Sequence, residues 1–287
     1  MFEGTINIGD VDLYYKVVGS GLAQQSKIDP RKPTLIVLHG GPGLDHTIHG
    51  PYWSRYADIC QVVLFDQRGQ GRSGKSTPDK WNLSQWATDL FLLCEKLEIA
   101  NPIVVGISTG GHVAQEYALK YPDHPSALIL SDTEAQQSLE KIVAIYREKG
   151  GDAAANAAQN VFTNTCEETL KQYSEVCVPL FQNNPQIKDS FFDCILKLDV
   201  TKQYNQNQHF KFNFLPRLKE VSCPCLIMVG DQGTLHRPSD AQQLAEALPQ
   251  RLVQFNLFHG AGTPVFNHFP NEVRECVLNF LHQRVWS

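Results

Sequence analysis

The stretch VVGISTGGHVA, residues 104–114, decides the fold of this 287-residue chain. It opens with a short apolar run, which is typical of a strand buried on both faces of a parallel sheet. The residues after it have a helical pattern. Between the two lies Gly106-Ile-Ser108-Thr-Gly110, a Gly-x-Ser-x-Gly sequence in the strand–turn–helix context of a nucleophile elbow.

The glycines around Ser108 have a physical reason. A serine in such a turn adopts a strained backbone conformation, and side chains at the flanking positions would clash. The turn lifts Ser108 clear of the sheet and directs the Thr109 amide and the positive end of the next helix toward a developing oxyanion. We therefore expect Ser108 to be a nucleophile. A plain small-residue turn between a strand and a helix is the structural alternative.

Two other glycine-rich turns follow predicted strands. HGGPG, residues 39–43, would bring backbone N–H groups to a substrate carbonyl, with Gly41 as the expected second oxyanion donor and Gly40 beside it. FDQRGQGRSG, residues 65–74, follows the next strand. Its glycines and Arg68 are expected to be architectural rather than catalytic.

The rest of the chain predicts an α/β fold. The runs PTLIVLHGG, QVVLFDQRG, PIVVGIS, SALILSDT and CPCLIMVGD are short, apolar and continuous, as buried parallel strands are. Helical patterns separate them, including WNLSQWATDLFLLCEKLEI with Ser84 as its expected N-cap. GTINIGDVDLYYKVVG alternates and breaks at Gly-Asp, which predicts an antiparallel pair at the start. Strands alternating with helices indicate a sheet with right-handed crossovers.

One region interrupts this alternation. Residues 134–211 contain no apolar strand run and are dominated by helical patterns such as QQSLEKIVAIYREKG. We predict a helical cap, or lid, inserted into a core made of residues 1–133 and 212–287.

Composition excludes several functions. The net charge of −5 offers no basic field for nucleic acid or anionic lipid, and no segment reaches the ~20 apolar residues of a membrane span. The chain starts without the pattern of a secretory signal. Its eight cysteines are interpreted as mostly buried free thiols, with Cys223 and Cys225 as packing residues, which favours a cytoplasmic protein.

The order of these motifs resembles the α/β-hydrolase superfamily, and most closely its proline iminopeptidase and enol-lactonase branch. The resemblance covers nearly the whole chain, most sharply residues 10–135 and 220–282. It implies eight mostly parallel strands, a helical lid, and acyl chemistry by a Ser-His-acid triad with no cofactor and no metal.

The sequence departs from that family at the acid. The family usually places it in a turn where this chain has Gly233, and Asp231 lies two residues too early. A second acid location in this fold is the end of the strand before the cap, where Asp132 stands. Asp132 is the predicted acid, with Glu134 in reserve. The structural alternative is that Asp132 only caps a strand or helix end.

The histidine position also differs. GAGTPVFNHFP fits the family's frame but has Thr263 where the histidine belongs, and threonine cannot act as a base near neutral pH. His259 and His268 are the candidate replacements, although either would need the loop to refold. A third group, His39, His46 and His49, borders the oxyanion turn.

The leading hypothesis is a serine hydrolase acting on a small ester, lactone, amide or aminoacyl substrate. The alternative is a triad-degenerate protein that binds a small ligand or catalyses a lyase, cyclisation or cofactor-free oxygenation reaction. Aromatic residues of the predicted cap favour an apolar or aromatic acyl group: Phe162, Tyr173, Phe181, Phe191 and Phe192. The cap acids, among them Asp189 and Asp193, are spaced as on a solvated helix face, so no amine site is assigned. A homodimer is compatible with the sequence.

Overall fold

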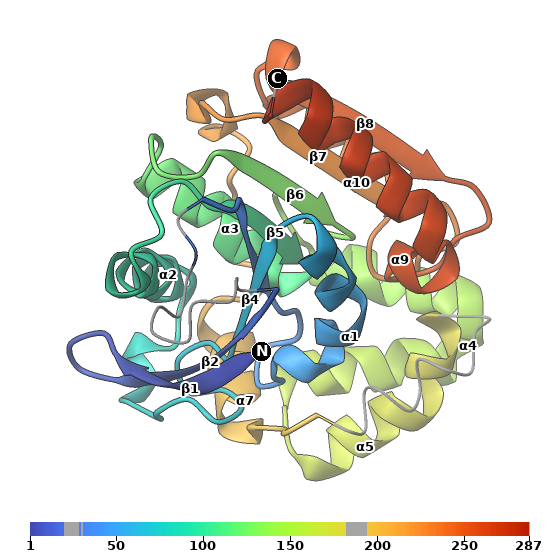
Figure 1. Ribbon diagram of the computed structural model, residues 1–287. Coiled ribbons are helices and arrows are strands. Elements are labelled where there is room, and N and C mark those ends of the chain that lie inside the picture. Colours follow the sequence, from blue (N-terminus) through green and yellow to red (C-terminus); the bar gives the residue numbers. More distant parts are fainter. Residues whose placement is uncertain (20–28, 30, 182–193, 287) are drawn as a thin grey trace.

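A computed structural model describes residues 1–19, 29, 31–181 and 194–286 (Figure 1). At its centre is an eight-stranded sheet in the order β1-β2-β4-β3-β5-β6-β7-β8. The pairs β1–β2 and β2–β4 are antiparallel and the other neighbouring pairs are parallel. The predicted α/β-hydrolase fold, with a mostly parallel sheet of eight strands and an antiparallel start, is confirmed.

The elements have the following bounds. The strands are β1 (Phe2–Asn7), β2 (Asp12–Val18), β3 (Thr34–Leu38), β4 (Gln61–Phe65), β5 (Ile103–Ile107), β6 (Ala127–Ser131), β7 (Cys225–Gly230) and β8 (Val253–Phe258). The helices are α1 (Gly50–Trp53), α2 (Leu83–Leu97), α3 (Thr109–Lys120), α4 (Leu139–Thr163), α5 (Glu167–Val176), α7 (Leu198–Asn207), α8 (Pro238–Ala247), α9 (Val265–His268) and α10 (Pro270–Arg284).

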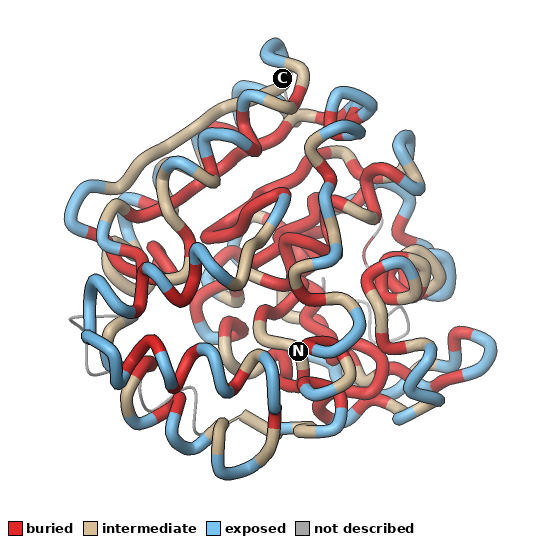
Figure 2. The backbone as a smooth tube through the Cα atoms, turned by 180° about the vertical axis from the view of Figure 1, so that it is seen from behind, coloured by how far each residue is buried: buried red, intermediate tan, exposed pale blue. Residues whose placement is uncertain are grey.

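Different helices cover the two faces of the sheet, because successive side chains of a strand point to opposite faces. In β3, Ile36 and Leu38 join a core shared with α2, α3 and α8, whereas Leu35 and Val37 join a second core shared with α1, α9 and α10. Figure 1 shows α10 in front of the strands and α3 behind them. Every residue of β3 to β7 is buried, and in Figure 2 the central strands are red along their length.

The described chain between β6 and β7 is helical. It contains α4, α5 and α7, which lie in the lower half of Figure 1, and residues of α4 and α5 such as Ile142, Tyr146 and Tyr173 form a small core of their own. A bridge between Gln136 and Asn213 joins the two ends of this segment. The helical pattern expected there is present, and the bounds 134–211 for a separate cap stay a prediction.

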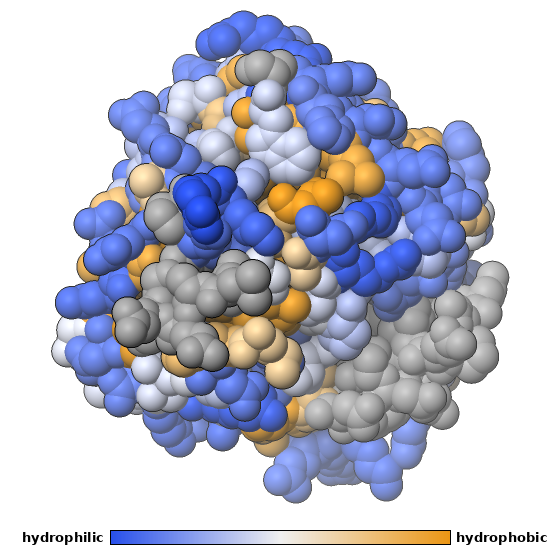
Figure 3. All heavy atoms as spheres, in the orientation of Figure 1, coloured by the Kyte–Doolittle hydropathy of each residue, from blue (hydrophilic) through white to orange (hydrophobic). Residues whose placement is uncertain are grey.

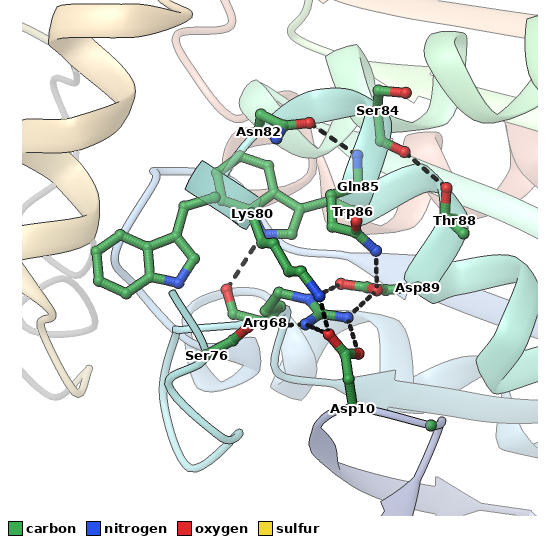
Figure 4. Close-up of polar contacts among 12 residues, drawn as sticks. Asp10, Arg68, Ser76, Lys80, Asn82, Ser84, Gln85, Trp86, Thr88 and Asp89 are labelled. Atoms are coloured by element: carbon green, nitrogen blue, oxygen red, sulfur yellow. Dashed lines mark hydrogen bonds and ion pairs between the residues drawn. The ribbon is translucent and has the colours of Figure 1, made fainter. Parts of the chain in front are cut away.

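Arg68 connects three parts of the core (Figure 4). Its side chain is fully buried and forms ion pairs with Asp89 of α2 at 2.7 Å and with Asp10, in the β1–β2 turn, at 2.8 Å. A buried guanidinium needs such partners because an unpaired charge is costly to remove from water. These contacts give Arg68 the architectural role expected of it.

The start of α2 corrects one expectation. Asn82, not Ser84, is the N-cap, and its side chain accepts a hydrogen bond from the Gln85 N–H at 2.9 Å (Figure 4). Ser84 lies inside the helix, where its carbonyl accepts from the Thr88 hydroxyl. Asn and Ser are comparably good N-caps, so residue type does not separate them. Asn82 takes the position because its backbone is extended, at φ −147° and ψ 162°, and the helix begins at the next residue.

On the face shown in Figure 3 the surface is mostly hydrophilic, with small and separate apolar patches. Scattered patches of this kind are ordinary on a protein surface. Within the described residues, no helix has both the length and the apolar character that a bilayer crossing requires. Cys60, Cys94, Cys177, Cys223 and Cys225 are buried free thiols.

Candidate active site

Ser108 occupies a strained turn between β5 and α3. Its φ of 51° and ψ of −122° lie in a backbone region that residues other than glycine rarely adopt. The turn is tied to the end of β6, because the Ser108 N–H donates to the Ser131 carbonyl at 3.2 Å and the Thr133 hydroxyl donates to the Ser108 carbonyl at 2.9 Å. The backbone therefore has the form that a nucleophile elbow requires.

The glycines of the motif allow close backbone approach. A Cβ at Gly106 would lie 2.6 Å from the Cα of Gly111, and one at Gly110 would lie 2.2 Å from the Leu38 carbonyl oxygen. No side chain fits at those distances, so α3 can pack directly on β3 and β5 only with glycine there.

The turn after β3 lies against the serine. A Cβ on Gly40 would be 3.1 Å from the Ser108 Cβ and 2.9 Å from the Ile107 carbonyl oxygen, and Gly41 has a positive φ of 65°. Thr109 is the first residue of α3, so its N–H has no acceptor within the helix. The predicted oxyanion residues Gly40, Gly41 and Thr109 line the same cavity as Ser108, and their role as oxyanion donors stays a prediction.

The two altered family positions lie side by side. A Cβ on Gly233 would approach Thr263 Oγ1 to 2.8 Å. Asp132, at φ 48°, is fully buried nearby; its Oδ2 accepts from the Ser131 hydroxyl at 2.7 Å and from the Val265 N–H at 3.0 Å. Burial raises the pKa of Asp132 to about 6, against the opposing hydrogen bonds from Ser131, Val265 and Thr263.

Neither predicted replacement histidine lines the cavity at Ser108. His259 is on the surface, with 80 % of its side chain exposed, and its Nδ1 contacts Asp231 Oδ2 at 3.0 Å. His268 ends α9, where partial burial lowers its pKa. The cavity next to Ser108 has a volume of about 200 Å³, and the histidines that line it are His49, His209 and His236.

A buried cluster adjoins this cavity and joins the reserve acid Glu134 to two histidines, His112 and His236, that the sequence analysis does not single out. The Glu134 carboxylate contacts His236 Nδ1 at 2.5 Å through one oxygen and His112 Nε2 at 2.9 Å through the other. All three side chains are at least 97 % buried. Glu134 follows β6, whereas the histidines follow the neighbouring strands β5 and β7, so the sheet order brings them together.

The charges of this cluster favour an ionised carboxylate. Burial alone would raise the pKa of Glu134, but the neighbouring His236 and His112 lower it to about 2. Burial lowers the pKa of His112. It also opposes a charge on His236, yet the adjacent Glu134 raises the pKa of His236 above its ordinary value.

One set of buried side chains has the composition of a metal site. Asp45, His46 and Asp66 each offer a ligand atom within 4.8 Å of the others. However, Asp66 Oδ1 already accepts from the His46 N–H and Nδ1, and its Oδ2 accepts from the Arg72 N–H. Asp45 Oδ2 accepts from the Ile195 N–H. These hydrogen bonds fix the loops around β4 and use the oxygens that a cation would need.

A family model described as alpha/beta hydrolase fold matches residues 33–262. The chain belongs to this family. The α/β-hydrolase resemblance inferred from the motifs is thereby confirmed, and the mostly parallel sheet agrees with it.

Named relatives of this α/β-hydrolase are similar over most of its length. The proline iminopeptidase of Clostridium botulinum is 27 % identical over 249 residues, which are 79 % of this chain and 81 % of the relative. The 3-oxoadipate enol-lactonase 2 of Acinetobacter baylyi is 25 % identical and is matched over 85 % of each chain. These relatives are hydrolases, which supports hydrolysis as the class of reaction for this chain.

Solved structures share the whole fold. A proline iminopeptidase-related protein from Thermus thermophilus superposes with a TM-score of 0.79 at 23 % identity and covers 99 % of both chains. A thermophilic esterase from Thermogutta terrifontis gives a TM-score of 0.74 at 25 % identity, also over 99 % of both chains. The first likeness shows the α/β-hydrolase fold alone.

Proposed function

We propose that this α/β-hydrolase cleaves small, uncharged esters or lactones with Ser108 as the nucleophile. The observation that carries the proposal is the position of Ser108: a strained turn that opens onto a cavity, with the backbone of Gly40 packed against its Cβ. Strain of this kind persists where the surrounding structure enforces it, and it is common at active sites.

The chemistry follows from this arrangement. Ser108 Oγ attacks the substrate carbonyl carbon, and a base in the site carries its proton to the alkoxide that later leaves. The N–H groups of Gly41 and Thr109, with the positive end of α3, stabilise the oxyanion that forms. Collapse of this intermediate releases the alcohol and leaves an ester on Ser108, which water then hydrolyses to free the acid and the serine.

The cavity lining supports an apolar, neutral acyl group. Among the described residues, the lining contains no Asp, Glu, Lys or Arg. Its apolar members come largely from the segment between β6 and β7 and include Ile142, Phe162, Leu170 and Tyr173. A free amine of an aminoacyl substrate would need a carboxylate in the cavity, and burying it without one is costly. Phe191, Phe192, Asp189 and Asp193 lie outside the described residues.

Thr263 favours a second candidate function. It occupies the family's histidine position beside Asp132, so no imidazole stands there to serve as the base. A protein that kept the cavity and lost the base would bind a small neutral ligand, or stabilise an enolate without hydrolysis. That candidate predicts an unreactive Ser108.

Covalent labelling tests the choice. A fluorophosphonate reacts only with an activated serine, and intact mass should show one adduct on the wild type and none on Ser108→Ala. The labelled protein should also have lost hydrolysis of p-nitrophenyl butyrate, and proline p-nitroanilide should be a poor substrate. Absence of labelling in a folded wild type contradicts the hydrolase proposal and favours the binding protein.

A further inference from the structure

The cavity histidines differ in what surrounds them. His49 lies next to Gly40, and its imidazole is buried. Burial, followed by the nearby His39, lowers the pKa of His49 to about 3. No carboxylate contacts its ring in the described part of the chain, so an imidazolium there would be buried without compensation.

His209 is fixed in another way. Its Nε2 contacts Gln137 Oε1 at 2.6 Å and its Nδ1 contacts Asn205 Oδ1 at 2.8 Å, so both ring nitrogens are engaged. Burial lowers its pKa to about 3. A ring with two amide partners has no free lone pair to take a proton from a serine.

His236 alone of these three contacts a carboxylate. Its Nδ1 is held by Glu134 at 2.5 Å, whereas its Nε2, also buried, has no partner among the described residues. Resting on the function proposed above, we propose that His236 Nε2 is the proton acceptor for Ser108 and that Glu134 orients the ring. The base and acid have thus moved from the family's usual places to the turns after β7 and β6.

The arrangement supplies the tautomer that this role needs. Because Glu134 accepts a hydrogen bond from Nδ1, the proton of neutral His236 is on Nδ1 and the lone pair is on Nε2. His112 holds the second carboxylate oxygen, and its own Nδ1 contacts the Tyr204 hydroxyl at 3.4 Å. The Glu134 carboxylate is therefore held by one histidine that follows β5 and by one that follows β7.

The proton balance is complete. His236 Nε2 takes the Ser108 proton as Oγ attacks, and the ionised Glu134 stabilises the imidazolium that results. The same Nε2–H is donated to the leaving alkoxide. In the second half, Nε2 takes a proton from water and returns it to Ser108 when the acid leaves, so the protein ends unchanged.

The charges around His236 set its pH dependence. Glu134 and Asp132 face it from the end of β6, His112 from α3, His209 from the segment after α7, and Asp240 from α8. The carboxylates outweigh burial and the neighbouring imidazoles, so the pKa of His236 is raised above 6.5. A base is active when unprotonated, and the labelling rate of Ser108 should therefore rise as pH passes through a midpoint above 6.5.

The test measures the fluorophosphonate labelling rate of Ser108 between pH 5 and 10 for the wild type, His236→Gln, Glu134→Gln and His282→Gln. The last is a matched control at an exposed residue of α10. We expect His236→Gln to slow labelling by about 100-fold or more. Glu134→Gln should slow it and move the midpoint to lower pH, and the control should match the wild type.

Two further measurements keep the result interpretable. Added imidazole should partly restore labelling of His236→Gly, which a purely structural role would not allow. In the wild type, the ring nitrogen resonances of one histidine should titrate above pH 6.5 and shift when Ser108 is phosphonylated. Full labelling in folded His236→Gln overturns this proposal and leaves the hydrolase function standing. A wild type that never labels overturns both.

Discussion

The backbone of Gly233 lies directly against the hydroxyl of Thr263. A Cβ at position 233 would be 2.8 Å from Thr263 Oγ1 and 2.6 Å from the carbonyl oxygen of His236. The two places where the family keeps an acid and a histidine are thus packed together here without either group. The turn that Gly233 allows is also the one that leads into His236.

Replacement of Gly233 by Ala should therefore disturb both the turn and His236. The new Cβ must displace backbone oxygen, and overpacking of this kind costs about 1–3 kcal/mol of the free energy of unfolding. Urea unfolding measures that loss, and the labelling rate of Ser108 should fall with it. Gly4→Ala is the control, because its Cβ would meet only the Phe2 ring at 3.6 Å. If Gly233→Ala and Gly4→Ala show the same stability and the same labelling rate of Ser108, the packing at Gly233 does not position the residues around Ser108.

Asp132→Asn tests how a buried carboxylate that is not part of the proposed His236–Glu134 pair affects stability. Burial raises the pKa of Asp132 from 3.8 to about 6, so the folded state binds more protons than the unfolded state between those values. Stability must then fall as the pH rises through this window. A shift of roughly two pH units corresponds to about 3 kcal/mol. The variant should gain stability relative to the wild type by up to that amount between pH 4 and 7.

Urea unfolding at several pH values measures this difference. Asp123→Asn, at an exposed carboxylate between α3 and β6, should run parallel to the wild type. The sequence predicts Asp132 as the acid, but its hydrogen bonds are to Ser131, Val265 and Thr263 rather than to a histidine ring. Folded Asp132→Asn with no Ser108 labelling would return the acid role to Asp132.

The elbow and the fold could be predicted because their signals are local. Gly106, Ser108 and Gly110 lie within a few residues of one another, where a predicted strand is followed directly by a predicted helix. Apolar runs identify the buried strands without any knowledge of which strands pair in the sheet. The cluster of Glu134, His112 and His236 could not be found in this way. Its members are joined only by the order β5-β6-β7, and a long helical segment separates β6 from β7 in the chain.

The sequence nonetheless contains a usable signal for the proposed base. Glu134 is the reserve acid, and His236 follows a predicted strand by a few residues, as His112 does. The carboxyl ends of parallel strands meet at one edge of the sheet, where such groups can converge. The family's frame predicts His259 and His268 instead, and neither residue lines the cavity at Ser108.

The Arg68 network predicts unequal costs for its two acids. Asp89 is buried, with 1 % of its side chain exposed, whereas 44 % of the Asp10 side chain is exposed. Asp89→Ala leaves a buried guanidinium short of its partner, which should cost about 3–5 kcal/mol. Asp10→Ala removes an exposed partner and should cost about 1 kcal/mol or less. Urea unfolding measures the loss of stability in each variant. Equal losses in Asp89→Ala and Asp10→Ala would contradict the idea that burial decides how much each partner of Arg68 contributes.

Gly40→Ala tests whether the turn after β3 positions the oxyanion donors. Its Cβ would lie 2.9 Å from the Ile107 carbonyl oxygen and 3.1 Å from the Ser108 Cβ, so the turn must move away from the serine. A misplacement on the order of 1 Å costs about 100-fold in rate. Fluorophosphonate labelling should therefore slow by roughly 10- to 100-fold, while the midpoint of its pH profile stays in place because His236 and Glu134 are untouched. A moved midpoint, or an unchanged rate in a folded variant, would show that Gly40 does not act through the oxyanion turn.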